Sequence, residues 1–510
     1  MRTLLCLLCL ALASCVTVRY LQVEPVDATV DDTVSITSPV KVHLVDGGTV
    51  VFEKGINVAD GKITGEGFRY DVALEIREPI VELSLDDVAA MESFQTPVNT
   101  GATAAASTGA TAAGGAGGLM FLKLIFGSCP TIYSLQANEP ILEAESFSYS
   151  IAPGFERRDV DRLGIDPGST GSIELELRNE ALETHYINQV ELLSVEHGPD
   201  DTVYTDNRSQ PLIVRDLQAP VSAMDNSGRR VDRIVAAADG IAWRSRDTRL
   251  EQVSGDDFRD TIDFSFAAPL GGGSTALVLR LRNSLLNTVL FYDVMLQGQG
   301  LHAIDWMGRD LTRLGSRYRL ARWYNETMGL RVLVWRDGDW QEIAAAGDTG
   351  PIAWKDIAVR LPESRGETVR VRLSFVADNW RIDRVSLGTI VSSGKFQRVP
   401  LQQIIDRDGA VHDAARENLH RSDRRYVITK PGDRLLLQFD AGLLRADRQH
   451  TFFLAATGYY IEWMRRDWLE TTTASTFVPG DAAVIDALRR WRTQRESMRE
   501  LFDATRINVR

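Results

Sequence analysis

The stretch Val369-Arg370-Val371-Arg372-Leu373-Ser374-Phe375 alternates apolar and polar side chains along its whole length. Because successive side chains of a β-strand point to opposite faces, this alternation predicts a strand with one buried face. Further strand-like runs occupy residues 330–335 and 357–361, and the first is followed by the turn sequence Asp337-Gly338-Asp339. This part of the chain is therefore expected to form a β-sandwich module.

Similar runs extend towards the N-terminus. Residues 40–45 and 49–53 flank the turn Asp46-Gly47-Gly48, and another turn follows at Asp60-Gly61. Short alternating runs separated by Gly-rich turns are typical of an antiparallel meander. Residues 33–98 are therefore expected to form a small, five-stranded β-barrel.

Two segments have helical periodicity instead. Residues 305–328 carry apolar side chains at roughly helical spacing, and residues 481–505 do so with Arg side chains largely off the apolar face. The C-terminal helix has two interpretations: it packs on its own domain, or it lies on anionic lipid. Packing is favoured because Trp491 and Phe502 need burial.

The predicted fold is mainly β and multidomain, with a small N-terminal β-barrel, central β-sandwich or jelly-roll-like modules with inserted helices, and a C-terminal amphipathic helix. The expected segments are a signal peptide (1–14), a tether (15–32), the small barrel (33–98), a Gly/Ala-rich linker (99–118), a β domain (119–270), a jelly-roll-like module with an inserted helix (271–395), a β segment (396–475) and the C-terminal helix (476–510). Residues 175–184 also parallel residues 279–288 at an offset of 104. The second copy is expected either to repeat a strand-turn-strand unit or to become a helix.

Composition narrows the function classes. The chain has 510 residues and a net charge of −13, which disfavours nucleic acid as a partner because such binding depends on neutralising phosphates. Of its four Cys residues, Cys6 and Cys9 lie in the expected signal. If Cys15 carries a lipid, Cys129 has no partner for an internal disulfide, and a Cys-based zinc site is excluded.

The N-terminus carries the most specific signal. A single Arg precedes an apolar run that is too short to span a bilayer and ends in small residues, which is typical of a secretion signal. Its last residues, Leu12-Ala13-Ser14-Cys15, resemble the lipobox of bacterial lipoproteins. The resemblance implies acylation of Cys15 and anchoring to the lipid bilayer of the cell envelope. Because Val16 and not Asp follows the Cys, it also implies the outer membrane.

Two interpretations remain for residues 101–126. The low-complexity run GATAAASTGATAAGGAGG is followed by LMFLKLIF, which favours either a flexible linker entering a strand or a membrane-contacting helix. The apolar part is short and contains Lys123, whereas a spanning helix needs about 20 residues. A linker is therefore preferred.

Two further resemblances are short. Ser128-Cys129-Pro130-Thr131-Ile132-Tyr133, together with a later Asn179-Glu180 and Glu183-Thr184-His185-Tyr186, is similar to uncharacterised exported bacterial proteins, a family that implies no activity. The segment 378–387, with Trp380-Arg381-Ile382-Asp383-Arg384-Val385, resembles the closing strand of jelly-roll modules.

No catalytic motif appears. The seven His residues form no HExxH pair, no P-loop follows a strand, and Asp406-Arg407-Asp408-Gly409 is interpreted as a turn and not as a calcium loop. His185 beside Glu183 is expected to be a solvated strand residue and not an acid-base group. No cofactor and no metal are expected.

Tryptophans supply the candidate ligand-binding residues. Trp340 and Trp380 are proposed for this role because an indole offers a flat apolar face that suits a sugar ring, although it equally suits a core. Trp335 is expected on the buried face of its strand, and Trp340 is expected to be exposed to solvent. The sequence thus favours a membrane-anchored lipoprotein that binds or scaffolds an envelope protein or polysaccharide without catalysis. The alternative is an envelope glycan hydrolase with an unrecognised carboxylate pair.

Overall fold

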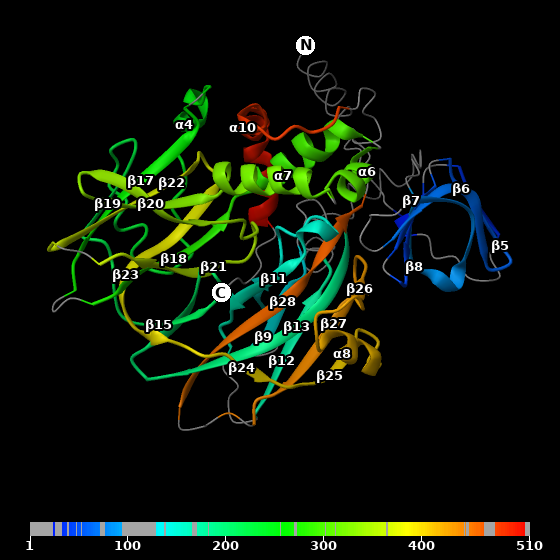
Figure 1. Cartoon of the computed structure of the whole chain (residues 1–510), viewed down its shortest axis with the longest axis horizontal. Coiled ribbons are helices and arrows are strands. Elements are labelled where there is room, and N and C mark those ends of the chain that lie inside the picture. Colours follow the sequence, from blue (N-terminus) through cyan, green and yellow to red (C-terminus); the bar gives the residue numbers. More distant parts are fainter. Residues whose placement is uncertain are drawn as a thin grey trace, which may run out of the picture.

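The computed structural model describes residues 24–25, most of 33–93 and most of 129–504, and the larger gaps within these ranges are 72–76, 166–170 and 464–474. Over these residues the fold is mainly β, with several sheets, one small closed barrel and a C-terminal helix (Figure 1). The alternation at 369–375 lies within strand β22 (Thr368–Val376), whose side chains alternate between buried and exposed or half-buried up to Phe375. The predicted fold class is therefore confirmed.

The N-terminal strands form one eight-stranded sheet around a core of their own. The strands are β1 (Glu24–Pro25), β2 (Val34–Ile36), β3 (Val40–Leu44), β4 (Thr49–Phe52), β5 (Ile56–Ala59), β6 (Lys62–Tyr70), β7 (Arg77–Ser84) and β8 (Val88–Ser93). The expected number of five strands was wrong for this unit, because several of its strands are only two to five residues long. The closed five-stranded barrel lies elsewhere in the chain.

Two sheets form what we call the central sandwich. One contains β9 (Thr131–Gln136), β10 (Glu139–Glu145), β12 (Ser172–Arg178), β25 (Leu401–Asp406) and β27 (Arg434–Asp440). The other contains β11 (Arg157–Arg162), β13 (Glu183–His197), β24 (Gln397–Val399), β26 (Val427–Thr429) and β28 (Gln449–Glu462). Apolar side chains from both sheets pack into one shared core, which holds the two layers together.

A second β unit, the inserted module, is formed by residues between the two halves of the central sandwich. Its closed barrel contains β14 (Thr202–Asp206), β15 (Pro211–Gln218), β18 (Thr275–Asn283), β21 (Lys355–Leu361) and β23 (Trp380–Ser393). Its open sheet contains β16 (Ser222–Asp225), β17 (Arg259–Ala267), β19 (Leu330–Arg336), β20 (Asp339–Ala346) and β22. Side chains of the open sheet pack against strands β18, β21 and β23.

The sheets do not follow the consecutive segments expected from the sequence. Strand β13 pairs over its whole length with β28, about 260 positions later in the chain, and strand β17 pairs with β22 across the expected boundary at residue 270. Segment boundaries at 270 and 395 therefore do not separate one sheet from the next. Pairing between distant strands leaves no mark on local periodicity, so the interleaving was not visible in the sequence.

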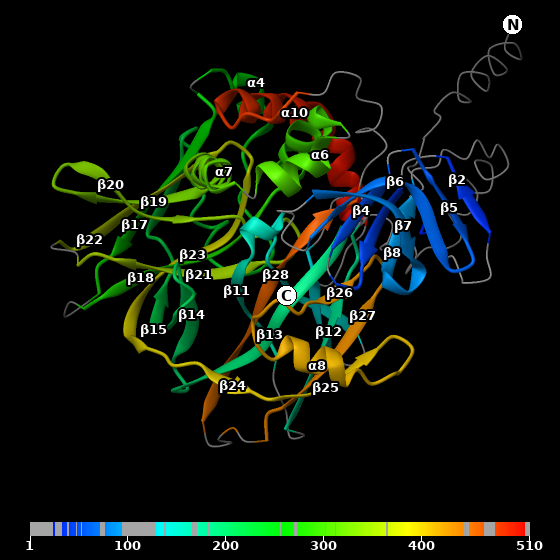
Figure 2. The same cartoon turned by 45° about the vertical axis from the view of Figure 1, so that its right-hand side comes forward.

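The helices of the described residues are η1 (Leu85–Asp87), η2 (Pro153–Phe155), α4 (Asp247–Gln252), α5 (Leu286–Thr288), the π-helix η3 (Val289–Leu296), η4 (Gln297–Gln299), α6 (His302–Asp305), the π-helix η5 (Trp306–Asp310), α7 (Leu314–Thr327), α8 (Asp413–Leu419) and α10 (Asp481–Ala504). Helices α4, α6, α7 and α10 gather on one side of the β layers, whereas α8 lies at the other end beside β13 and β25 (Figure 2). The helix expected at 305–328 is present as η5 and α7. We call residues 286–327, between β18 and β19, the helical insert.

The C-terminal helix α10 packs on the helical insert, as the sequence favoured. Val484, Leu488 and Trp491 are buried in the same apolar core as the insert. The Trp491 indole also donates a hydrogen bond of 2.8 Å to the Asp378 carboxylate.

The two copies of the sequence echo take different structures. The first copy runs from β12 directly into β13, whereas the second leaves β18 and enters α5. The helical alternative for the second copy is therefore correct, and it starts the helical insert.

The N-terminal sheet contacts the central sandwich through buried polar groups. Lys41 and His43 of β3 are fully buried, and the Lys41 ammonium donates a hydrogen bond of 2.7 Å to the Glu462 carbonyl. His43 stacks on Trp463, and burial together with the neighbouring Lys41 charge lowers its pKa well below the usual value. The interface between the N-terminal sheet and the central sandwich is therefore buried like the interior of a domain. This burial holds the sheet in place against the sandwich.

Several predictions concern residues outside the described part of the chain. They are the signal and lipobox through Cys15, most of the tether, the linker at 99–118 and the apolar run that follows it. Among the helices of the described ranges, none combines the length and the apolar character needed to cross a bilayer.

Candidate functional site

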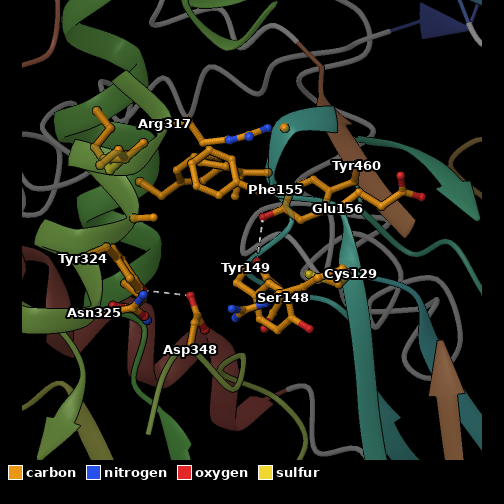
Figure 3. Close-up of a pocket in the computed structure, with 18 of the residues that line it drawn as sticks. Cys129, Ser148, Tyr149, Phe155, Glu156, Arg317, Tyr324, Asn325, Asp348 and Tyr460 are labelled. Carbon is orange, nitrogen blue, oxygen red and sulfur yellow. Dashed lines mark hydrogen bonds between the residues drawn. The ribbon is translucent and has the colours of Figure 1, made fainter. Parts of the chain in front are cut away.

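A cavity of about 730 Å³ lies between the central sandwich and the helical insert. It is lined by the segment from β10 to β11, the first residues of the insert, helix α7 and the loop 348–351 between β20 and β21 (Figure 3). This volume is in the range that holds small-molecule ligands. The π-helix η3 supplies part of the wall, and π-helices are rare features that often occur at functional sites.

The walls of the cavity are mostly aromatic and aliphatic. Their side chains are Tyr149, Ile151, Phe155, Phe291, Tyr292, Met295, Leu314, Tyr318, Leu320, Tyr324 and Tyr460. Leu314 and Tyr318 on α7 are 73% and 65% exposed and mark the mouth. The helical spacing of these two residues predicted the helix, and both line the cavity.

The inner end of the cavity is polar, and Glu145 is its central group. Glu145 is the last residue of β10, and its Oε2 accepts hydrogen bonds from the backbone N–H groups of Ile352 (2.9 Å) and Ala353 (3.2 Å). Its Oε1 is buried and makes no hydrogen bond to any described residue. Burial raises the pKa of this carboxyl to about 8, so it is mostly neutral at pH 7.

A second carboxyl, Asp348, lines the same cavity. Its Oδ2 accepts a 2.8 Å hydrogen bond from the Tyr324 hydroxyl of α7, and its Oδ1 accepts one of 2.9 Å from the Gly350 N–H. Burial raises its pKa as well. Gly350 has a φ of +76°, and a Cβ there would overlap the Glu145 carboxylate, so glycine is required where the loop approaches β10.

Further acidic groups surround the inner end. Glu183 lines the cavity and contacts His185 at 2.7 Å (Oε1 to Nε2), and both side chains are fully buried. The expectation that His185 is a solvated strand residue was therefore wrong, because residues 183–188 of β13 are all buried and both faces of the strand are covered there. Glu462 accepts a hydrogen bond from Tyr292. Burial, together with the nearby acids, raises the pKa of the Cys129 thiol well above its usual value.

The cationic residues of the cavity wall, Arg157 and Arg317, lie nearer the solvent. The Arg157 guanidinium is exposed and stacks on the Tyr149 ring at 3.4 Å. Arg317 lies beside Phe155, away from Asp348 and Tyr324 (Figure 3). The inner end of the cavity thus carries several acidic groups, and Arg317 lies away from them (Figure 3).

Trp340 and Trp380, the ligand-binding candidates from the sequence, do not line this cavity. Trp380 is fully buried, and its indole N–H points to the Met328 carbonyl at 3.3 Å, so it is a core residue and does not present a surface to a ligand. Trp340 is half-buried in β20, and its ring contacts Trp335 at 5.3 Å. Trp335, expected inside, is 37% exposed, so that expectation was wrong.

Trp335 and Trp340 share an outer sheet face with arginines. The Arg370 guanidinium lies 4.7 Å from the Trp335 ring, and that of Arg372 lies 4.4 Å from the Trp340 ring. The indole faces are therefore already partly covered by cations of the chain itself.

The segment 406–409 is a turn, as predicted. The Asp406 Oδ1 accepts hydrogen bonds of 2.9 Å from the N–H groups of Asp408 and Ala410. Across the described ranges, no group of three or more His, Cys, Asp and Glu side chains is arranged to hold a metal ion.

Sequence reasoning did not find Glu145, Asp348 or Tyr324. The local sequence around Asp348 and Gly350 indicates a turn, and Glu145 ends an ordinary strand. Nothing in the sequence signals that these segments converge, because the convergence depends on the helical insert folding back over the central sandwich.

Comparisons with known proteins give no identification. No protein-family model matches the chain, and no curated protein matches its sequence. Among solved structures, an alpha-xylosidase from Xanthomonas citri is 10% identical with a TM-score of 0.16, covering 85% of this chain and 38% of its own. An uncharacterised Listeria monocytogenes protein solved with glucose, magnesium and calcium is 8% identical with a TM-score of 0.16, covering 71% of this chain and 29% of its own. The chain therefore spans less than half of either protein, and likenesses this weak carry no argument about fold or function.

Proposed function

We propose that this chain is a non-catalytic binding protein of the bacterial envelope, tethered to the outer membrane by a lipid on Cys15, and that its ligand occupies the cavity beside the helical insert. The observation that carries the proposal is the cavity itself. Apolar walls enclose about 730 Å³, and a few polar groups stand at the buried inner end. Such a combination is typical of a site that binds an apolar body and orients it through a polar head.

Protonation favours binding over hydrolysis. A glycosidase needs one carboxyl as an acid and a second one ionised as a nucleophile or base. Burial raises the pKa of both Glu145 and Asp348, and the Asp348 charge raises that of Glu145 further. The site is therefore better suited to holding a ligand than to attacking one.

Glycan hydrolysis remains a second candidate because two carboxyl groups line one cavity, with Glu145 kept neutral as a glycosidic acid would be. Incubating the purified protein with peptidoglycan and with nitrophenyl glycosides tests it. Turnover that disappears in Glu145→Gln would replace the binding proposal with hydrolysis.

Nile red, a neutral dye whose fluorescence rises in apolar surroundings, tests the binding proposal directly. We expect saturable binding of about one dye per chain, as a single cavity of this size allows. Ala321→Phe places a ring in the cavity from α7 and should abolish binding. Ala345→Phe, the same change at an exposed position of β20, is the control and should bind normally. No saturable binding, or equal binding by the two variants, would refute the proposal.

A further inference from the structure

We infer that the ligand carries a protonated amine on an apolar or aromatic body, and that the amine lies at the inner end of the cavity against Glu145 and Asp348. This inference rests on the proposed function and specifies the chemical class of its ligand. It follows from three features of the inner end: an unsatisfied oxygen, the sign of the surrounding charges, and the aromatic rings.

The Glu145 carboxyl is fixed but incompletely satisfied. The two backbone N–H groups of residues 352 and 353 hold Oε2 and orient the group, while Oε1 makes no hydrogen bond to a described residue. The side chain is only 2% exposed and lines the cavity. In the ionised carboxylate this buried oxygen is an acceptor without a donor, which costs free energy, and a ligand that donates a hydrogen bond to it recovers that cost.

The charges around the inner end select the sign of the ligand. Glu145, Glu183 and Asp348 line it, whereas Arg317 lies away from Asp348 (Figure 3) and the exposed Arg157 is the cationic lining residue that acts on Asp348. At Cys129, burial raises the thiol pKa, and the charges of these acids raise it further. An ammonium group is therefore attracted to this end, and a carboxylate is repelled.

Aromatic rings complete the environment. Tyr149, Tyr292, Tyr324 and Tyr460 line the cavity, and the Tyr149 ring already receives the Arg157 cation on its face. Ring faces stabilise an ammonium group that has lost its water. The Asn287 amide lies beside the Tyr324 hydroxyl and makes no hydrogen bond of ordinary geometry to the described residues. Its oxygen can therefore accept a further hydrogen bond from the ligand.

Binding of a cation should also expel a proton. Glu145 faces Asp348, which raises its pKa, and Arg282 of β18, which lowers it. Asp348 in turn faces Arg157 of β11 and Lys355 of β21. A bound ammonium group favours the ionised form of Glu145, so the amine should bind more tightly as the pH rises from 6 to 8.

Three probes that share a naphthalene ring system but differ in the charge of the attached group test the effect of ligand charge on binding. They are 1-naphthylmethylamine, 1-naphthylmethanol and 1-naphthoate, each titrated against the full-length protein carrying Nile red. We expect the amine to displace the dye at a concentration at least about 10-fold lower than the alcohol, and the carboxylate to be weakest. Equal potency of amine and alcohol, or strongest displacement by the carboxylate, would overturn the inference while leaving the proposed function intact. Absence of dye binding would instead refute the proposed function.

Two variants test whether the amine of the ligand lies against Glu145 and Asp348. Glu145→Gln and Asp348→Asn should each bring the amine close to the potency of the alcohol, whose own potency should stay unchanged and shows that the cavity is intact. Glu139→Gln, at the exposed start of the same strand, is the matched control. Near pH 7, calorimetry in two buffers should detect the release of up to about one proton per amine bound. The Glu145→Gln variant should release no such proton. An amine preference that survives both variants would overturn the placement.

Discussion

Replacing Glu145 by Gln should change how the stability of the fold depends on pH. Glutamine has the same shape and keeps an oxygen for the N–H groups of Ile352 and Ala353, but it does not ionise. In the folded protein the pKa of Glu145 is about 8, against an ordinary value of 4.5 in the unfolded chain. The substitution therefore removes one large difference in proton affinity between the two states.

The sign follows from which state holds the proton. Above pH 4.5 the unfolded chain ionises, while the folded protein keeps its proton up to about pH 8. Raising the pH through this interval therefore favours unfolding by about 1.4 kcal/mol per pH unit. The stability is fully present below pH 4.5 and is lost as the pH approaches 8. Between about pH 5 and pH 8 the wild type loses on the order of 4 kcal/mol of unfolding free energy in this way. The Glu145→Gln variant does not undergo this loss.

Urea unfolding of the wild type and of Glu145→Gln at about pH 5, 6.5 and 8 measures this difference. The variant should gain stability relative to the wild type at each step upward in pH. Glu139→Gln is exposed and should follow the wild type within about 0.5 kcal/mol throughout. Parallel pH curves for the wild type and Glu145→Gln would show that Glu145 is already ionised in the fold. The proton-release argument would then fail.

Three other outcomes are expected. Cys15→Ala should lose acyl labelling and leave the membrane fraction; retention after a carbonate wash would show that residues 101–126 insert. The mature protein should show one titratable thiol when denatured, Cys129, and none in the folded state, because burial raises its pKa; a reactive native thiol would contradict the buried position. Trp380→Ala should destabilise the fold by about 3–5 kcal/mol, the cost of emptying a fully buried site, whereas Trp340→Ala should cost less than about 1 kcal/mol. The reverse order of destabilisation would make Trp340 the core residue.

Local periodicity determined the type of each element. The alternation at 369–375 and the apolar spacing at 481–505 specified a strand and a helix, because the side chains that a regular element buries recur at its own period. The same rule gave the class of the fold. It also favoured packing of the C-terminal helix, since a face carrying Trp491 is stabilised by burial.

Periodicity alone left the choice between two faces open. In β19, Leu330, Val332 and Val334 are buried, while Leu333 and Trp335 share the outer face with Arg331. Both faces carry apolar residues, so the sequence pattern fitted either orientation, and the expectation that Trp335 lies inside failed. The pairing of β19 with β22 decided which face turned inward.

The cavity depended entirely on tertiary structure. Glu145 ends a strand of the central sandwich, Asp348 lies in a loop of the inserted module, and Tyr324 lies on a helix between them in the sequence. Each is unremarkable in its local context, and their raised pKa values arise from burial that exists only after the three segments meet. The sequence by itself therefore determined which elements form, because that depends on neighbouring residues. Only the tertiary structure decided which carboxyl groups lose water and face a ligand, because desolvation depends on what the rest of the chain places around them.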